Sequence, residues 1–427
     1  MSDAVATVGW QPLGIPFEFV LFGLTLLGVA LFHHRTLQVA ATGLLVIVTY
    51  KLAFTGFHQG PGLGGLAGHL QGEWVVLLNL FGLLMGFALL SRHFEESQVP
   101  RQLPDYLPDD WRGGFVLLVM VFVLSSFLDN IAAALIGGTV AATVFRHKVH
   151  VGYLAAIVAA SNAGGSGSVV GDTTTTMLWI DGVNPLDVVH AYVAAGVALV
   201  VCGIPASLQQ QKHSPILKHG TARTPVDWSR VAIVALILLA AIGVNVTTNV
   251  RFPELSARFP FLGCTVWVVL VLTAGWRRPD WSVMPATLRG TAFLLCLVLA
   301  ASLMPVERLP AASATTTFGL GVVSAVFDNI PLTKLALEQG GYDWGVLAYA
   351  VGFGGSMIWF GSSAGVALTN LFPDARSVGA WLRGGWHVAL AYVLGFATLI
   401  LVMGWHPHPP HRAGHAASEP AAVEGVR

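Results

Sequence analysis

The sequence predicts an all-α polytopic membrane protein with two inverted-topology repeats, each made of five transmembrane spans and one re-entrant hairpin, with interrupted helices near the midplane. Composition is the first observation behind this fold class: 55% of the 427 residues are hydrophobic and only 10% are charged, too few to cover a soluble domain. Apolar runs of membrane-spanning length are the second observation. The third is a pair of motifs that occurs once in each half of the chain.

Plain apolar runs of about spanning length account for most of the expected spans. The first run follows residues 1–14, which lack the basic region and cleavage site of a signal peptide, so we expect this run to stay in the membrane. The runs lie at residues 17–32, 37–54, 74–90, 188–206, 229–247, 261–275, 286–304 and 380–403.

Four further apolar segments are interrupted by polar or glycine-rich residues and form two matching pairs. In the first pair, Asp129 aligns with Asp328, and S-x-x-x-D-N-I is found in both halves. In the second pair, Gly164 aligns with Gly354, and the next glycine, the serine after it and a further glycine also coincide. Because both motifs recur in the same order, we interpret the chain as an internal duplication.

The distribution of Lys and Arg predicts how the segments cross the membrane, because short cytoplasmic loops are enriched in these residues. Lys and Arg gather most clearly on one side of the membrane if the Asp-Asn segments are re-entrant hairpins and the glycine-rich segments are broken spans. Each half then has an odd number of spans, so the second half enters the membrane upside down relative to the first. Inverted repeats with broken helices are typical of secondary transporters.

This topology divides the chain into two repeats, a linker and a tail, with both termini outside the inner (plasma) membrane. The first repeat is residues 1–206, with a hairpin at about 114–145 and a broken span at about 152–180. A cytoplasmic linker at 207–228 leads to the second repeat, residues 229–403, with a hairpin at about 312–338 and a broken span at about 344–371. Residues 404–427, which are rich in His and Pro, are expected to be a disordered tail.

Charge and cysteine content exclude several classes of partner and cofactor. The formal net charge is zero and no long basic block occurs, so no nucleic-acid partner is expected. Cys202, Cys264 and Cys296 lack the spacing of a disulfide framework or a zinc site. The expected partners are the lipid bilayer and a small ion, with no cofactor beyond sodium or a proton as the coupling ion.

Ionisable residues at membrane depth cost about 3 kcal/mol or more each and are therefore functional candidates. Sodium prefers carboxylate and amide oxygens, so Asp129 and Asp328, with their neighbours Asn130 and Asn329, are candidate ligands from the two hairpin tips. A buried carboxylate can also exchange a proton for a metal ion, which is the minimal chemistry of an antiporter. The candidates for proton coupling are Asp129, Asp172, Asp328 and Lys334.

Each candidate also has a structural interpretation. The aspartates could be N-caps of the half-helices that follow them, although Ser362 aligns with Asp172 and a cap alone therefore needs no carboxylate there. Lys334 could pair with a carboxylate or extend to the membrane surface. Hydroxyls such as those of Thr173 and Thr174 often bond back to their own helix.

The motifs "SSFLDNIAAAL" and "NAGGSGSVVGDTTTTMLW" resemble the ion transporter superfamily, which includes NhaD-type sodium/proton antiporters, arsenite permeases and citrate and dicarboxylate carriers. The tips "LDNIA" and "FDNIP" are most similar to the NhaD type, and the similarity covers about residues 74–403. This resemblance implies exchange of sodium or lithium for protons, and is compatible with a homodimer. The expected ion or substrate site is Asp129, Asn130, Asn162, Gly164, Gly165, Asp172, Thr173, Thr174, Asp328, Asn329, Ser362 and Ser363.

Two alternatives remain at this point. The first tip has Ala132 where the second has Pro331, and the small residues near Ser362 could receive an anion's oxygens, as in a carrier for citrate or another small anion or in an arsenite permease. A site ringed by aspartates nevertheless repels an anion, and no buried arginine is expected to hold one. An intramembrane hydrolase would need Ser166 or Ser168 beside His190 or His69, but His69 is predicted in an external loop, so no enzyme is expected.

Overall fold

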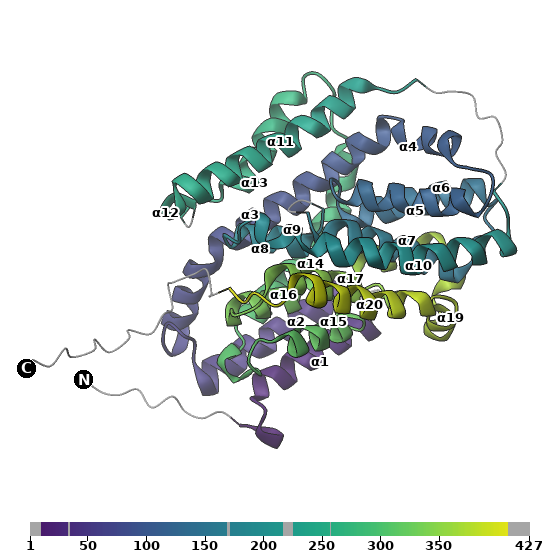
Figure 1. The fold of residues 1–427 in the computed structure, drawn as a ribbon. Helices are drawn as coiled ribbons and strands as arrows, with labels where there is room; N and C mark the ends of the chain where they lie inside the picture. The colour runs from purple at the N-terminus through teal and green to yellow at the C-terminus, as the bar shows by residue number, and fades with distance from the viewer. Residues whose placement is uncertain (1–9, 33–34, 169–170, 217–224, 257, 409–427) are drawn as a thin grey trace, which may run out of the picture.

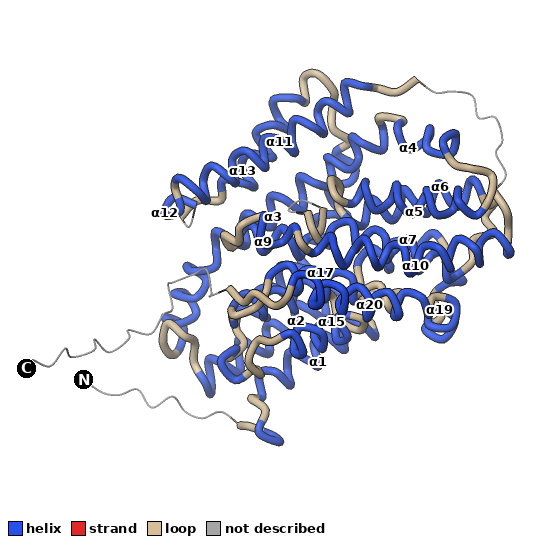
Figure 2. Tube along the Cα trace, viewed as in Figure 1, coloured by secondary structure: helices blue, strands red, loops and turns tan. Residues whose placement is uncertain are grey.

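The computed structural model describes residues 10–32, 35–168, 171–216, 225–256 and 258–408, and all of the regular secondary structure in these residues is helical apart from one isolated bridge. Figure 2 shows the helices and the loops that join them. Six helical stretches in the described residues are long and apolar enough to cross a membrane: Thr36–Thr55, Gly62–Glu96, Leu186–His213, Trp228–Asn249, Trp281–Ser302 and Trp386–Met403. Shorter apolar helices accompany them. The predicted all-helical membrane class is therefore confirmed.

The first half of the chain contains a helical hairpin followed by a broken helix. It begins with α1 (Phe17–Leu31), α2 (Thr36–Tyr50) and α3 (Gly62–Glu96), and a short α4 (Val99–Gln102) follows. The hairpin consists of α5 (Trp111–Ser125) and α6 (Asn130–Val144), and the broken helix of α7 (Val151–Ser166) and α8 (Thr173–Ile180). A short α9 (Leu186–Val189) and the long α10 (Ala191–His213) complete this half.

The second half also contains a hairpin followed by a broken helix, but its short helix comes after the first long helix and not after the third. It contains α11 (Trp228–Arg251), α12 (Pro253–Ser256), α13 (Phe261–Thr273) and α14 (Met284–Ser302). The hairpin consists of α15 (Ala314–Ser324) and α16 (Asn329–Gln339), and the broken helix of α17 (Trp344–Gly354) and α18 (Ser363–Leu371). The short α19 (Val378–Gly384) and α20 (Trp386–Met403) end it.

The two halves pack against each other through their hairpins and broken helices. In Figure 1, α10 runs along α20, while α11 and α13 lie side by side against α3 at the upper edge. The second part of each broken helix contacts the hairpin of the other half: α6 packs against α18, and α8 packs against α16. Fully buried alanines at helical spacing on α10, such as Ala191, Ala194 and Ala198, allow its neighbours to approach closely.

Equivalent hydrogen bonds in the two halves hold each hairpin against the broken helix of its own half. Ser125 Oγ donates to the carbonyl oxygen of Ser161 at 2.5 Å, and Ser324 Oγ, its aligned counterpart, donates to the carbonyl oxygen of Val351 at 2.7 Å. The acceptors, Ser161 and Val351, also align with each other when Gly164 is placed on Gly354. Residues that align between the two halves of the sequence therefore also make equivalent hydrogen bonds in the structure.

Glycine is required where α7 and α17 cross the hairpins. A Cβ at Gly164 would lie 2.0 Å from the carbonyl oxygen of Phe122, and one at Gly354 would lie 2.1 Å from that of Gly321. Phe122 and Gly321 occupy equivalent positions in the aligned hairpins. The glycine-rich motifs thus permit close backbone contact just before each helix breaks.

The structure differs from the sequence-based expectations at three boundaries. Helix α3 begins at Gly62, so His69 lies in this helix and not in an external loop as predicted. Helix α10 continues to His213, into the expected linker. Residues 404–408, expected as part of a disordered tail, are bound to the segment before α17: the backbone N–H of His408 donates to the Tyr342 carbonyl at 2.9 Å, and that of His406 to Asp343. The remainder of the tail lies outside the described residues.

Candidate functional site

Asp129 and Asp328 occupy equivalent positions at the tips of the two hairpins. Each is the residue immediately before the second helix of its hairpin, with φ/ψ of −53°/140° and −53°/139°. Asp328 accepts hydrogen bonds from the backbone N–H of Ile330 at 3.0 Å and from Ser363 Oγ at 3.2 Å. It therefore caps α16, as the structural interpretation expected, and also binds α18, the second part of the broken helix of its own half.

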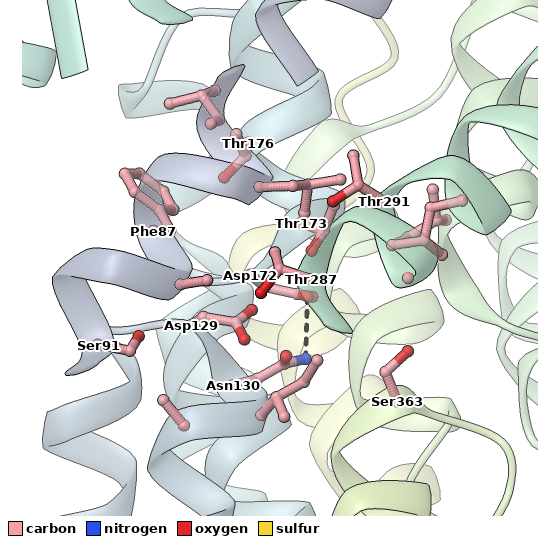
Figure 3. A pocket seen from close by; sticks show the side chains of 18 of the residues that line it. Phe87, Ser91, Asp129, Asn130, Asp172, Thr173, Thr176, Thr287, Thr291 and Ser363 are labelled. Atoms are coloured by element: carbon pink, nitrogen blue, oxygen red, sulfur yellow. Dashed lines mark hydrogen bonds between the residues drawn. The ribbon is translucent and has the colours of Figure 1, made fainter. Parts of the chain in front are cut away.

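Asp172 joins the two hairpin tips. Asn130 Nδ2 donates to its Oδ1 at 3.1 Å, and Asn329 Nδ2 donates to its Oδ2 at 3.4 Å. Figure 3 shows Asp172 beside Asp129 and Asn130. Because Asp172 is only 2% exposed, these amides stabilise its carboxylate in place of water.

The last turns of α7 also contact the break in the second half. Asn162 accepts from Asn130 Nδ2 at 3.0 Å and donates to Ser356 Oγ at 2.9 Å. Its aligned counterpart, Gly352, faces the same centre: a Cβ there would lie 3.2 Å from Asp172 Oδ2. The site therefore combines aligned positions of both halves: a polar side chain at Asn162, and at Gly352 a glycine that lets Asp172 approach closely.

A cavity of about 320 Å³ ends at these residues. Asp129, Asn130, Asp172 and Asn329 line it, together with hydroxyls of Thr173 and Ser363. Its walls come from α3 and α14, with Phe87 and Ser91 on one side and Thr287 and Thr291 on the other (Figure 3). Arg92 and Glu95 line it near the end of α3 and also line a second hollow of about 750 Å³. The site is therefore reached from the face where α3 ends.

Arg92 is the one basic side chain that lines the cavity within the described residues. Its guanidinium donates to Asp280 at 2.9 Å and to Glu95 at 3.0 Å, and lies 3.4 Å from Glu96. The positive charge of Arg92 is thus balanced by carboxylates near the end of α3. The inner end of the cavity presents carboxylates, amides and hydroxyls.

The other predicted site residues have mainly structural contacts. The carbonyl oxygen of Gly164 accepts from Ser126 and Tyr192, and that of Gly165 from Thr175 at 3.4 Å. Thr174 is fully buried in α8 and is not among the residues that line the cavity. The hydroxyl of Ser362 accepts a hydrogen bond from the Gly365 N–H and so caps α18. Ser362 therefore occupies the position that aligns with Asp172 but does not make the contacts that Asp172 makes.

Lys334 lies outside the cavity and is paired with carboxylates. Its Nζ is 2.8 Å from Glu73 Oε2 and 2.5 Å from Glu338 Oε1. Of the two sequence interpretations, pairing therefore applies. Glu73 was missed because it stands at the edge of the apolar run 74–90, where it resembles a residue of the preceding loop.

Sequence reasoning also missed the hydroxyls on the cavity wall. Thr287 and Thr291 lie one turn apart on α14, and this spacing within an apolar run was the signal that could have found them. Thr176 from the quoted Thr run lines the cavity as well.

The serine–histidine pairs considered for a hydrolase are not formed. His190 Nε2 bonds Asp343 at 2.8 Å, and His69 Nε2 bonds Ser302 at 2.9 Å. Ser166 Oγ donates to the Ala163 carbonyl and Ser168 Oγ to the Ser126 carbonyl. Neither serine is positioned as a nucleophile beside one of these rings.

Long apolar helices around two broken helices, with a polar site at the end of a cavity, define a multi-pass membrane protein of the secondary transporter class. The chain belongs to the citrate transporter family (CitMHS), whose sequence model matches residues 8–354. This is a family of transporters and not of enzymes.

Three curated proteins resemble the chain, each with 26–27% sequence identity. It is 26% identical over 333 residues to "Sodium/proton antiporter 1" of Arabidopsis thaliana, covering 68% of this chain and 56% of that protein. It is 27% identical over 297 residues to "Sodium/proton antiporter 2" of the same plant, covering 61% of this chain and 69% of that protein. It is 26% identical over 333 residues to "Na(+)/H(+) antiporter NhaD" of Vibrio parahaemolyticus, covering 66% and 78%. The chain thus spans little more than half the length of the first of them.

Proposed function

We propose that this protein exchanges sodium or lithium for protons at the centre formed by Asp129, Asp172 and Asp328. The observation that carries the proposal is the position of Asp172, whose two oxygens accept hydrogen bonds from the tips of both hairpins at the inner end of the cavity. The names of the three curated relatives support the same activity.

Competition for one carboxylate would couple the two ions. When Asp172 or Asp129 carries a proton, it is neutral and attracts no cation; when it has lost the proton, the buried charge attracts a small hard cation. The amides of Asn130, Asn162 and Asn329 could turn their oxygens toward such an ion, and Thr173 and Ser363 add hydroxyl oxygens. Gly164, Gly165, Thr174 and Ser362 would support this site through the backbone of the broken helices.

Alternating access follows from the proposed inverted topology. With five spans and a hairpin in each repeat, 1–206 and 229–403, the end of α3 and the cavity mouth lie on the cytoplasmic side, together with the linker at 207–228. Both termini lie outside the inner membrane. Helix α6 packs against α18, and α8 packs against α16. These contacts support the inverted arrangement, because each half then contributes one pair of helix ends to each side of the ion site. A homodimer fits the same topology.

The description of the family as citrate transporters gives a second candidate, a sodium- or proton-coupled carrier of citrate or another small anion, and an arsenite permease is a third. An anion would need a cation to hold its charge. Arg92 is held by three carboxylates near the mouth of the cavity, so the charges at the site favour a cation as the transported ion.

Purified protein in liposomes that contain a pH-sensitive dye can test the proposal. Sodium, lithium and potassium chlorides, citrate and arsenite are added in turn. We expect sodium or lithium chloride alone to drive proton movement. A response that requires citrate or arsenite would replace the antiporter by one of the alternative carriers.

A further inference from the structure

A buried ionic cluster lies where α3 meets α16, outside the cavity. Lys334 is 1% exposed and pairs with Glu73, itself 7% exposed, at 2.8 Å. Glu338, one turn further along α16, provides a second carboxylate at 2.5 Å. His69, one turn before Glu73, bonds Ser302 on α14 at 2.9 Å. Side chains of α3 therefore meet side chains of α14 and α16, which come much later in the sequence.

This cluster lies on the opposite side of the site from the cavity mouth. On α3 the cavity lining runs from Leu80 to Glu95, whereas Glu73 precedes Leu80 by almost two turns, about 10 Å along the helix. On α16, Asn329 reaches Asp172, and Lys334 lies about 7.5 Å further along the axis. One end of the site is thus open to a cavity, and the other end is crossed by an ion pair.

The ion pair is suited to two states. In the dry interior, separating Glu73 from Lys334 without admitting water costs free energy, because a 2.8 Å ion pair is lost while both groups stay buried, even though Lys334 keeps Glu338 as a partner. Asp181, at the end of α8, adds to the negative field at Lys334. If α3 and α16 separated, water would solvate both groups, so the pair favours either full contact or full separation.

We propose that Glu73 and Lys334 form a seal that keeps the ion site closed toward the face opposite the cavity, and that they separate when the site opens to that face. The second half of this statement rests on the proposed exchange function. Lys334 is then a positioning residue: it selects the face to which Asp172 is accessible and does not bind the ion. Glu338 remains with Lys334 on α16 in either state.

Cysteine accessibility tests the seal without requiring transport. In full-length protein with Cys202, Cys264 and Cys296 replaced by Ala, Ser91→Cys places a reporter in the cavity wall. Its labelling by a membrane-impermeant maleimide is measured in vesicles of each orientation. We expect Lys334→Met and Glu73→Gln to slow labelling by about threefold or more, because loss of the seal shifts the population toward the state in which the cavity is closed.

Two further variants separate a seal from simple structural damage. The charge exchange Glu73→Lys with Lys334→Glu is expected to restore labelling toward that of the parent. Arg112→Met, which removes an exposed pair with Asp110, is the matched control and is expected to label as the parent does. Unchanged labelling in folded Glu73→Gln and Lys334→Met would overturn the proposal, and so would loss of folding in both.

The result is independent of the ion specificity. If sodium drives no proton movement but labelling still shifts, the exchange function fails and the seal remains. If exchange is present and labelling does not shift, only the seal fails.

Discussion

Asn130 donates to Asp172 at 3.1 Å across 42 positions of sequence, and so joins the tip of the first hairpin to the broken helix that follows it. The same nitrogen also reaches Asn162. Asn329 approaches the other oxygen of Asp172 from the second half of the chain. One carboxylate is therefore shared by two hairpins from different halves of the chain, and the predictions for transport follow from it.

Asp172→Asn should reduce sodium-driven proton movement by about tenfold to a hundredfold, because hydrogen bonds to a charged group contribute about 1.5–3 kcal/mol and the exchangeable proton is also lost. Initial rates in dye-loaded liposomes measure the effect. Asp374→Asn, at an exposed position, is the control. Full exchange by Asp172→Asn would show that this residue only supports the helix start.

Asn130→Ala should weaken sodium binding more than Asn329→Ala does. Asn130 contacts both Asp172 and Asn162 at 3.0–3.1 Å, whereas Asn329 reaches Asp172 at 3.4 Å. We expect the sodium concentration for half-maximal exchange to rise about tenfold for Asn130→Ala and about threefold for Asn329→Ala. The reverse order would mean that the second tip provides the main ligand.

Gly164→Ala and Gly354→Ala should each destabilise the protein by about 1–3 kcal/mol, as overpacking of a dense interior does. The added methyl group would meet a carbonyl oxygen of the neighbouring hairpin at about the same distance in both halves. Thermal unfolding in detergent measures the change. Gly243→Ala on α11, where a Cβ meets nothing within 4 Å, should leave the melting temperature unchanged or raise it. Equal stability of all three variants would contradict the close contact.

Stability should depend on pH through Asp227, which begins α11. The Arg277 guanidinium, which donates to Asp227 at 2.9 Å, holds the pKa of this carboxyl below its usual value. A lowered pKa means that the pair stabilises the folded state above about pH 4, the ordinary pKa of Asp, and that this contribution is lost as the pH falls through the lower folded value.

Arg277→Met should therefore lower the melting temperature by about 1–2 °C at pH 7, since exposed ion pairs contribute little. The difference from the parent should shrink as the pH falls from 7 to below about 4, the ordinary pKa of Asp. Melting curves across this range measure it. A difference that stays constant with pH would point to lost packing of the Arg277 side chain instead of lost charge.

The positions of the helices could largely be predicted from the sequence, because they depend on local composition. The apolar runs at 37–54 and 344–371 lie within a few residues of the observed helices and the broken helix. Where the sequence failed, the local signal was weak. Gly and polar residues mark a loop by composition, yet Gly62–Gly72 is part of α3, since packing against neighbouring helices stabilises it.

The sequence by itself determined the membrane class, the two matching motifs and the acidic residues at the hairpin tips, because each depends on the hydrophobicity or spacing of nearby residues. Only the tertiary structure decided which of them meet. Asp172 contacts Asn329 across 157 positions, and Lys334 pairs with Glu73 across 261. Such partners are set by how the helices cross, and a carboxylate at the end of an apolar run looks the same in sequence whether it faces solvent or a buried lysine.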